Sequence, residues 1–279
     1  MSPNVAQHCN SKRAAGGWPA ATALRVRTSD GMAGEYEELM RRATADTRVV
    51  GVVVGGSRGR GVATAQSDWD VYIFVRDDAD AAEVARTLDR VTHPVEVCAV
   101  QRLSHFVSDD GVPEWNRYTF AHVAPVLDRT DGALQQACAE KERLDEATAH
   151  ARAVLNLEGY VNSCYRSVKN HRDGNEAAAR LDAAESINYL LEFIFADARR
   201  VRPYNKYLQW ELAHHPLPSP CWSDAHVLPG LLDIVSTGTA QRQSALFGVV
   251  ESHARESGHA AQLDSWGHRT LNLLRNQAP

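Results

Sequence analysis

The sequence has few cysteines, and they form no pattern that holds a metal. Five cysteines are scattered over 279 residues, and none belongs to a CxxC or a Cys/His spacing typical of a zinc site. Widely separated cysteines in odd number are typical of free thiols in a reducing compartment. The cysteines therefore favour a protein stabilised by its hydrophobic core over a disulfide scaffold or a zinc module.

Long apolar runs are also missing. No stretch approaches the roughly 20 consecutive apolar residues that a membrane-spanning helix needs. The first residues carry the basic pair Lys12-Arg13 without a hydrophobic segment after it, so we expect no secretory signal. From these two absences we expect a cytoplasmic protein with no membrane partner.

An excess of positive charge is absent as well. The net charge is −5 and the pI is near 6.2, whereas proteins that bind nucleic acid broadly usually have a basic domain. The charge balance is compatible with a cationic small molecule as substrate. The contents of 44% hydrophobic and 23% charged residues are ordinary for a globular protein long enough for two modest domains.

The most informative segment covers residues 55–74 and reads GGSRGRGVATAQSDWDVYIF. An apolar run, Val49–Val54, leads into its glycines, and a polar loop separates them from a second apolar run, Val71–Val75. The pattern predicts a strand, a tight glycine turn and a second strand. Because side chains alternate across a strand, we expect Asp68 and Asp70 to project from the same face.

Two carboxylates held one residue apart repel each other unless a cation lies between them. Mg²⁺ prefers hard carboxylate oxygens and takes its remaining ligands from water and substrate phosphates. Gly56 allows the backbone to approach a phosphate closely, and Ser57 and Ser67 add hydroxyl donors. These residues predict a site for Mg²⁺ and a nucleotide, with Asp68 and Asp70 as metal ligands. A hairpin with an aspartate pair that faces solvent is the alternative that the residues leave open.

This segment resembles the signature of the DNA polymerase β-like nucleotidyltransferase superfamily, in which Gly-Gly/Ser precedes Asp-x-Asp by about ten residues. Gly56-Ser57 and Asp68-x-Asp70 fit that signature. The fuller pattern, Gly-Ser-Arg-Gly followed by Ser-Asp-Trp-Asp, is most similar to antibiotic nucleotidyltransferases of the aminoglycoside and lincosamide type and to minimal nucleotidyltransferases. Trp69 departs from the smaller aliphatic residue that is usual there. The resemblance implies a two-metal Mg²⁺ site and ATP or another NTP as co-substrate.

Glu96 is the candidate third acid. It lies in the expected strand 95–100, where alternation places it on the face opposite Val95, Val97 and Ala99. The resemblance implies a third acid on the next strand of the sheet, which would serve as metal ligand, as general base or as both. A charge that faces solvent on a half-exposed strand is the alternative.

Lys206 is the candidate phosphate-binding cation. It lies in the aromatic segment 202–212, RPYNKYLQWEL, just after a helix is expected to end. The resemblance implies a lysine of the helical domain that reaches the β- and γ-phosphates. Tyr204 or Trp210 is a candidate to line the nucleotide or acceptor pocket. The alternative is a solvated cation favoured by the helix dipole.

The pair Arg166 and His171 also matches a loose arginine–histidine spacing of HEPN ribonucleases, which keeps a ribonuclease as a further alternative.

The remaining chain divides into a strand-and-helix part and a helical part. We expect helices at 32–45 and 77–90 and a strand or turn leading to 124–128, and then only helices, with apolar residues at three- and four-residue spacing. The expected fold class is α/β (α+β), a mixed-sheet nucleotidyltransferase domain followed by an all-α helical bundle. The expected division is a flexible N-terminus at 1–30, a catalytic domain at 31–130 and a helical bundle at 131–279.

The predicted function is Mg²⁺-dependent transfer of a nucleoside monophosphate, with AMP from ATP as first choice, to a hydroxyl of a small acceptor, as in antibiotic resistance. Asp68, Asp70 and Glu96 are the catalytic and metal-binding candidates; Gly56, Ser57, Ser67 and Lys206 are the candidates for holding the triphosphate. Two alternatives remain open: a toxin–antitoxin-type enzyme that modifies tRNA or a protein, and a non-catalytic nucleotide-binding module. The sequence does not identify the acceptor, the nucleobase or the oligomeric state, although an aromatic cluster near Trp210 or Trp222 is a candidate homodimer face.

Overall fold

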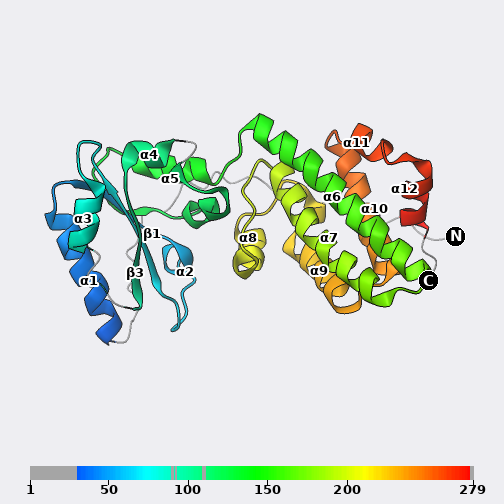
Figure 1. Cartoon of the computed structure of the whole chain (residues 1–279), viewed down its shortest axis with the longest axis horizontal. Helices are drawn as coiled ribbons and strands as arrows, with labels where there is room; N and C mark the ends of the chain where they lie inside the picture. The colour runs from blue at the N-terminus through cyan, green and yellow to red at the C-terminus, as the bar shows by residue number, and fades with distance from the viewer. Residues whose placement is uncertain (1–29, 89–90, 92, 109–110, 277–279) are drawn as a thin grey trace, which may run out of the picture.

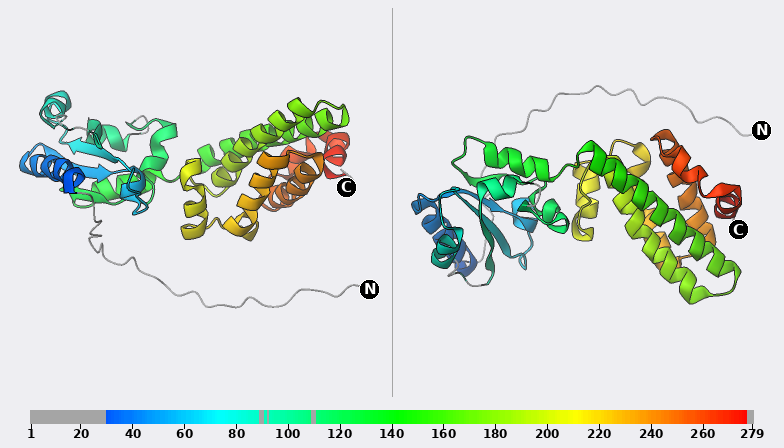
Figure 2. Two further views of the ribbon diagram at one scale, coloured as in Figure 1. Left: turned by 90° about the horizontal axis from the view of Figure 1, so that it is seen from below. Right: turned by 45° about the horizontal axis from the view of Figure 1, so that its top comes forward.

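The computed structural model describes residues 30–88, 91, 93–108 and 111–276. The N-terminal segment that was expected to be flexible, 1–30, lies outside the described residues except for its last residue. A part built on a β-sheet and an all-helical part lie side by side along the long axis of the molecule (Figures 1 and 2). The predicted fold class, a mixed sheet with helices followed by a helical region, is confirmed.

The sheet has four strands in the order β3-β2-β1-β4. β1 pairs antiparallel with both β2 and β4, whereas β2 and β3 run parallel. The strand bounds are β1 Val49–Val54, β2 Trp69–Val75, β3 Val95–Arg102 and β4 Pro125–Asp128. The expected strands are all present, with β2 beginning two residues earlier and β3 ending two residues later than the apolar runs predict.

Helices cover both faces of the sheet, and the alternation along β2 explains why. Val71 and Ile73 pack with α1 (Asp30–Ala45) and α3 (Ala81–Leu88) on one face. Tyr72 and Phe74 point to the other face, which is covered by α4, α5 and η2. Those elements span Leu103–Val107, Ala133–Lys141 and Glu114–Phe120. The expected helix at 77–90 begins later, at Ala81, where the Asp80 side chain accepts a hydrogen bond from the Ala82 amide.

A β-bulge interrupts the pairing of β2 with β3. The register shifts between Val71 and Tyr72, which leaves Cys98 without a partner in β2. Simple alternation predicts Ala99 on the face of Val97, and this prediction is wrong. The bulge turns Ala99 to the other face, where it packs with Tyr72. Bulges of this kind redirect side chains and are frequent beside active sites.

The helical part is organised around a long hairpin of two helices, α6 (Glu146–Arg172) and α7 (Glu176–Asp197). Asp145 is the N-cap of α6, and its side chain accepts a hydrogen bond from the Thr148 amide. The later helices complete a single hydrophobic core with this hairpin. They are α8 Leu208–His214, α9 Asp224–Thr237, α10 Ala240–Glu256, α11 Ala260–Asp264 and α12 Gly267–Arg275. Among the described helices, none combines the length and apolar character needed to cross a membrane.

The structure bears on the predicted domain boundary at 130/131 and on the predicted dimer face. α5 packs against β4 and η2, so contacts with the sheet continue past residue 130; the division at 130/131 stays a prediction. Trp222 is only 2% exposed and packs in the helical core, so the expectation that it is exposed is wrong. Whether the protein is a homodimer is likewise still a prediction.

The junction between the two parts is formed by η3 (Asn205–Tyr207) and α8. Both lie on the side of the helical part that faces the sheet (Figure 1). The predicted glycine turn after β1 is the short helix α2 (Gly56–Gly59). Its residue Ser57 lies 3.0 Å from Tyr207 through their hydroxyl oxygens. This contact brings the segment around Lys206 next to the glycine turn, although about 150 residues separate them in the sequence.

Candidate active site

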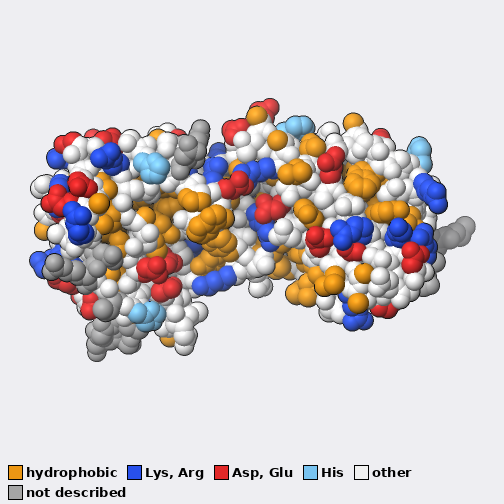
Figure 3. Space-filling model, in the orientation of Figure 1, with side chains coloured by type: hydrophobic (Ala, Val, Ile, Leu, Met, Phe, Trp, Pro, Cys, Tyr) orange, Lys and Arg blue, Asp and Glu red, His pale blue; other side chains and the backbone are white. Residues whose placement is uncertain are grey.

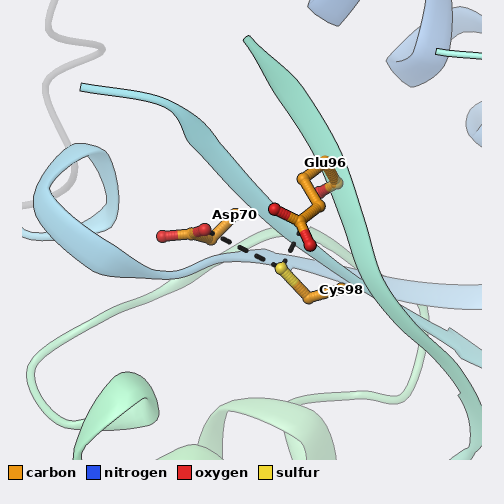
Figure 4. A group of neighbouring side chains, drawn as sticks. All are labelled: Asp70, Glu96 and Cys98. Carbon is orange, nitrogen blue, oxygen red and sulfur yellow. Dashed lines mark hydrogen bonds between the residues drawn. The ribbon is translucent and has the colours of Figure 1, made fainter. Parts of the chain in front are cut away.

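Three side chains from adjacent strands converge beside the glycine turn. Asp70 comes from β2, and Glu96 and Cys98 come from β3; one ligand atom of each lies within 4.8 Å of the other two (Figure 4). The register that pairs Asp70 with Glu96 brings the carboxylates together, and the bulge adds Cys98, whose thiol donates to Asp70 Oδ1 over 3.8 Å. The structure therefore joins two of the three predicted acids.

The electrostatics of this cluster favour a cation. Burial raises the pKa of Asp70, and the negative charges of Asp68 and Glu96 raise it further. The hydrogen bond from Cys98 and the positive charge of Lys206 lower the same pKa without cancelling the rise. A carboxylate in this position is costly to ionise until a cation neutralises its neighbours.

Asp68 lies beside the cluster but is not one of its converging side chains. It is exposed and directly precedes β2, which begins at Trp69. It is close enough for its charge to raise the pKa of Asp70. It is not part of the group formed by Asp70, Glu96 and Cys98, whose ligand atoms lie within 4.8 Å of one another. Its role as a metal ligand stays a prediction.

The glycine turn is held directly against Asp70. The Gly55 amide donates to the backbone oxygen of Asp70 over 2.8 Å. Gly56 has a φ of +60°, in the left-handed region, and a Cβ there would lie 2.3 Å from Asp70 Oδ2. Only glycine combines this backbone conformation with such a close approach.

The two predicted serines are buried and already have hydrogen-bond partners. Ser57 Oγ lies 3.0 Å from Tyr207 Oη. Ser67 Oγ accepts a hydrogen bond of 2.9 Å from the Thr64 amide and thereby closes the loop before β2. Both side chains are only 5% exposed. Their contact with a triphosphate stays a prediction.

Trp69 fixes the backbone that carries the aspartates. Its ring stacks on Tyr36 of α1 with centroids 3.7 Å apart, and the Arg58 guanidinium lies 4.4 Å from its ring centroid. Arg58 also donates to the backbone oxygens of Ser67 and Asp68. The unusual tryptophan is therefore part of the support of the loop, and the Arg58 side chain is occupied in holding that loop.

Lys206 lies in η3 and is exposed. Its Nζ is 5.3 Å from the ring centroid of Tyr207, and its charge acts on Asp70 across the junction. A cation of the helical part therefore acts on the carboxylate cluster through its charge. Its contact with the β- and γ-phosphates stays a prediction.

One cavity is lined by residues of the cluster, and a second shares Trp115 with it. One, of about 470 Å³, is lined by Glu96, Cys98 and Trp115 among others. The other, of about 390 Å³, is lined by Trp115, Tyr204 and Asn188 among others. Trp115 is 74% exposed and contributes to both. Sequence reasoning missed Trp115 and Cys98, since the first lies in an irregular segment without a motif and the second is exposed to the site by a bulge.

The arginine–histidine pair of the ribonuclease alternative is engaged within the helical part. Arg166 forms ion pairs with Asp182 and Glu185. The Nε2 atom of His171 contacts the backbone oxygen of Gly238. Both side chains have structural partners, and this geometry gives no support to a ribonuclease site.

The comparison with protein families concerns the sheet part. Residues 37–117 match the family described as "Nucleotidyltransferase domain". The match runs from α1 to η2 and includes the glycine turn, both aspartates and Glu96. It does not identify a subfamily, and a comparison with curated proteins gives no match.

Proposed function

We propose that the protein transfers a nucleoside monophosphate from an NTP to a hydroxyl of a small acceptor. The premise is that residues 37–117 are a Pol β-like nucleotidyltransferase domain, which makes this chain an enzyme of that class. AMP from ATP is the first choice of donor. The observation that carries the proposal is the convergence of Asp70 and Glu96 beside the Gly56 turn, with Lys206 acting on the same cluster.

The carboxylates of Asp70, Glu96 and the adjacent Asp68 are the residues that would hold Mg²⁺. Their hard oxygens suit this ion. Burial and the charges of Asp68 and Glu96 raise the pKa of Asp70 in spite of the charge of Lys206, so a divalent cation would stabilise the ionised carboxylates. The thiol of Cys98 is a soft donor and is not assigned as a ligand. When bound, the metal neutralises charge on the phosphate oxygens and aligns the attacking and leaving groups.

The side chains of this chain then have separate tasks. The acceptor oxygen attacks the α-phosphorus, and the bond from that phosphorus to the bridging oxygen of the β-phosphate breaks, so that pyrophosphate leaves. Glu96, which lines the 470 Å³ cavity, takes the proton of the attacking hydroxyl. Lys206 binds the leaving phosphates, and Gly56 permits the close approach of the backbone to them.

The cavities support a small acceptor. Volumes of about 470 and 390 Å³ are within the usual range for small-molecule sites. Trp115 and Tyr204 offer flat aromatic faces to a ring-bearing compound. Two acids of the second cavity, Glu114 and Glu192, are paired with arginines, so this wall presents balanced charge. We extend the proposal to an antibiotic of the aminoglycoside or lincosamide class as the acceptor to test first.

The charge distribution on one face of the molecule gives no support to tRNA as the preferred acceptor. Acidic and basic side chains are interspersed on the face of the described residues drawn in Figure 3, and no broad basic area covers either part on that face. An enzyme that modifies tRNA needs such a surface for the phosphate backbone. The paired acids Asp70 and Glu96 likewise support catalysis over nucleotide binding alone.

Label transfer from α-³²P-ATP with Mg²⁺ tests the proposal. The acceptors are offered separately: aminoglycosides, lincosamides, bulk tRNA and the proteins of a cell lysate. Asp70→Asn is the inactive blank, and Asp78→Asn is the matched control, because Asp78 is exposed and pairs only with Arg76 among the contacts described. Label on a small molecule with wild type and Asp78→Asn, but not with Asp70→Asn, is the expected result.

Two other results would contradict this proposal. Label on tRNA or protein alone would replace the small acceptor by a macromolecule. ATP binding without transfer of label to any acceptor, and without pyrophosphate from any NTP, would show a binding module.

A further inference from the structure

One arginine in the loop after β1 is buried and holds the glycine turn. Arg60 is only 8% exposed. Its guanidinium donates to the backbone oxygen of Gly56 over 3.0 Å and also to the backbone oxygen of Tyr118. The same group lies 4.4 Å from the ring centroid of Tyr118 and 4.7 Å from that of Tyr207. A buried guanidinium with two carbonyl acceptors and two aromatic faces is firmly fixed.

The two rings beside Arg60 come from different parts of the molecule. Tyr118 belongs to η2, next to the sheet, whereas Tyr207 ends η3 in the helical part. Tyr207 makes a second contact with the turn, because its hydroxyl lies 3.0 Å from Ser57 Oγ. The helical part therefore reaches the glycine turn twice, through a ring beside Arg60 and through a hydroxyl on Ser57.

A buried carboxylate fixes the position of these rings. Glu211 of α8 is 1% exposed. It accepts a hydrogen bond of 2.6 Å from the Tyr118 hydroxyl and forms an ion pair with Arg200. Its second oxygen lies 3.0 Å from His122 Nε2. Because a buried carboxylate is stable only when such partners surround it, Glu211 ties α8, and with it Tyr207, to η2.

The same short segment carries Lys206. Lys206 directly precedes Tyr207 in η3, so the contacts that fix Tyr207 also fix the backbone from which Lys206 extends. The turn itself requires glycine, since Gly56 has a φ of +60° and lies against Asp70.

We propose that Arg60, Tyr118, Tyr207 and Glu211 form a positioning network through which packing of the helical part sets the conformation of the Gly56-Ser57 turn and thereby its affinity for the NTP. The inference rests on the proposed function. The four residues act through the turn and do not touch the reacting atoms. Because the same interface between the two parts positions both the turn and Lys206, we expect both to reach their NTP-binding positions together.

Tyr207→Phe is the decisive variant because it keeps the ring beside Arg60 and removes only the hydroxyl. The loss of one neutral hydrogen bond predicts a KM for the NTP that rises by about 2- to 12-fold, with kcat within about two-fold of wild type. Tyr165→Phe is the matched control, since Tyr165 packs on the helical core from α6. A KM for Tyr207→Phe equal to that of Tyr165→Phe would overturn the network.

A double-mutant cycle separates the contact from other effects of either change. The Kd of the Mg²⁺ complex of α,β-methylene-ATP is measured by equilibrium dialysis for Ser57→Ala, for Tyr207→Phe and for both together. If the hydroxyl of Tyr207 acts through Ser57, Tyr207→Phe has no further effect in the Ser57→Ala background. If the double variant instead raised the Kd by the product of the two single effects, the inference would be overturned.

Arg60 is tested by rescue with a conservative residue. Arg60→Lys keeps the charge but loses the fork that reaches Gly56 and Tyr118, whereas Arg60→Met keeps only the stem. We expect the affinity for the same analogue to fall from wild type to Arg60→Lys and again to Arg60→Met, with equal affinities contradicting the network. A wild-type protein that does not bind the analogue would refute the proposed function and this inference with it, whereas wild-type binding that all these variants retain would refute the inference alone.

Discussion

Replacing Gly56 by alanine tests whether the glycine turn is held against a catalytic carboxylate. Gly56 has a φ of +60°, and an alanine in the left-handed region costs about 1–2 kcal/mol of stability. Its Cβ would also lie 2.3 Å from Asp70 Oδ2. That oxygen must then move by about 1 Å, a displacement that costs an active site about 100-fold in rate. Because the oxygen is the end of a flexible side chain, the movement adds little to the loss of stability.

Gly61 provides the matched control for this change. It has a φ of +72° in the same loop, but nothing lies within 4 Å of the position of its Cβ. Gly61→Ala therefore carries the same backbone strain without the collision. We expect both variants to melt roughly 2–8 °C below wild type by circular dichroism, and only Gly56→Ala to lose label transfer. Transfer rates that agree within a few-fold between the two alanine variants would refute the placement of Asp70 in the reaction.

Four further predictions concern the charged groups. Asp70→Asn abolishes label transfer with the fold intact by circular dichroism, and Asp68→Asn has a smaller effect because Asp68 is exposed beside the cluster; equal, wild-type rates in both would refute the metal assignment. Glu96→Gln lowers kcat more than it weakens ATP binding, since it removes a proton acceptor; an unchanged rate would place the third acid elsewhere. Lys206→Met raises the KM for the NTP more than it lowers kcat, and an unchanged KM would contradict a contact with the phosphates. Burial raises the pKa of the Glu211 carboxyl, but hydrogen bonds from neighbouring donors outweigh burial and lower this pKa from 4.5 to about 2. The stability that Glu211 contributes is therefore present above pH 4.5 and is lost as the pH falls toward 2, so the difference in urea midpoint between wild type and Glu211→Gln should shrink over that range; a constant difference would contradict this.

Local patterns in the sequence were sufficient to predict the strands and the long helices, but not the short helices α4 and η2 in the irregular segment after β3. β1 follows from an uninterrupted run of valines, and the helical hairpin follows from apolar spacing of three and four residues. The strand carrying Glu96 could be placed beside Asp70 only through the family resemblance, because one sequence does not reveal which strands pair.

Features that depend on packing could not be read from the sequence. The bulge at Cys98 changes which side chains of β3 share a face, and no residue type near it signals the shift. The burial of Arg60 between two tyrosines depends on a segment far along the chain. An isolated loop arginine has the same sequence pattern whether it is solvated or holds a turn.

The proposed reaction at Asp70 and Glu96 is attack on the α-phosphorus of an NTP, which transfers the nucleotidyl group to the acceptor. Parallel reactions with α-³²P-ATP and γ-³²P-ATP, with Mg²⁺ and the same acceptor, test this claim most directly. We expect that the α-label appears on the acceptor, that the γ-label appears only in pyrophosphate, and that Asp70→Asn shows neither. Transfer of the γ-label to the acceptor, or transfer of the α-label by Asp70→Asn at the wild-type rate, would contradict it.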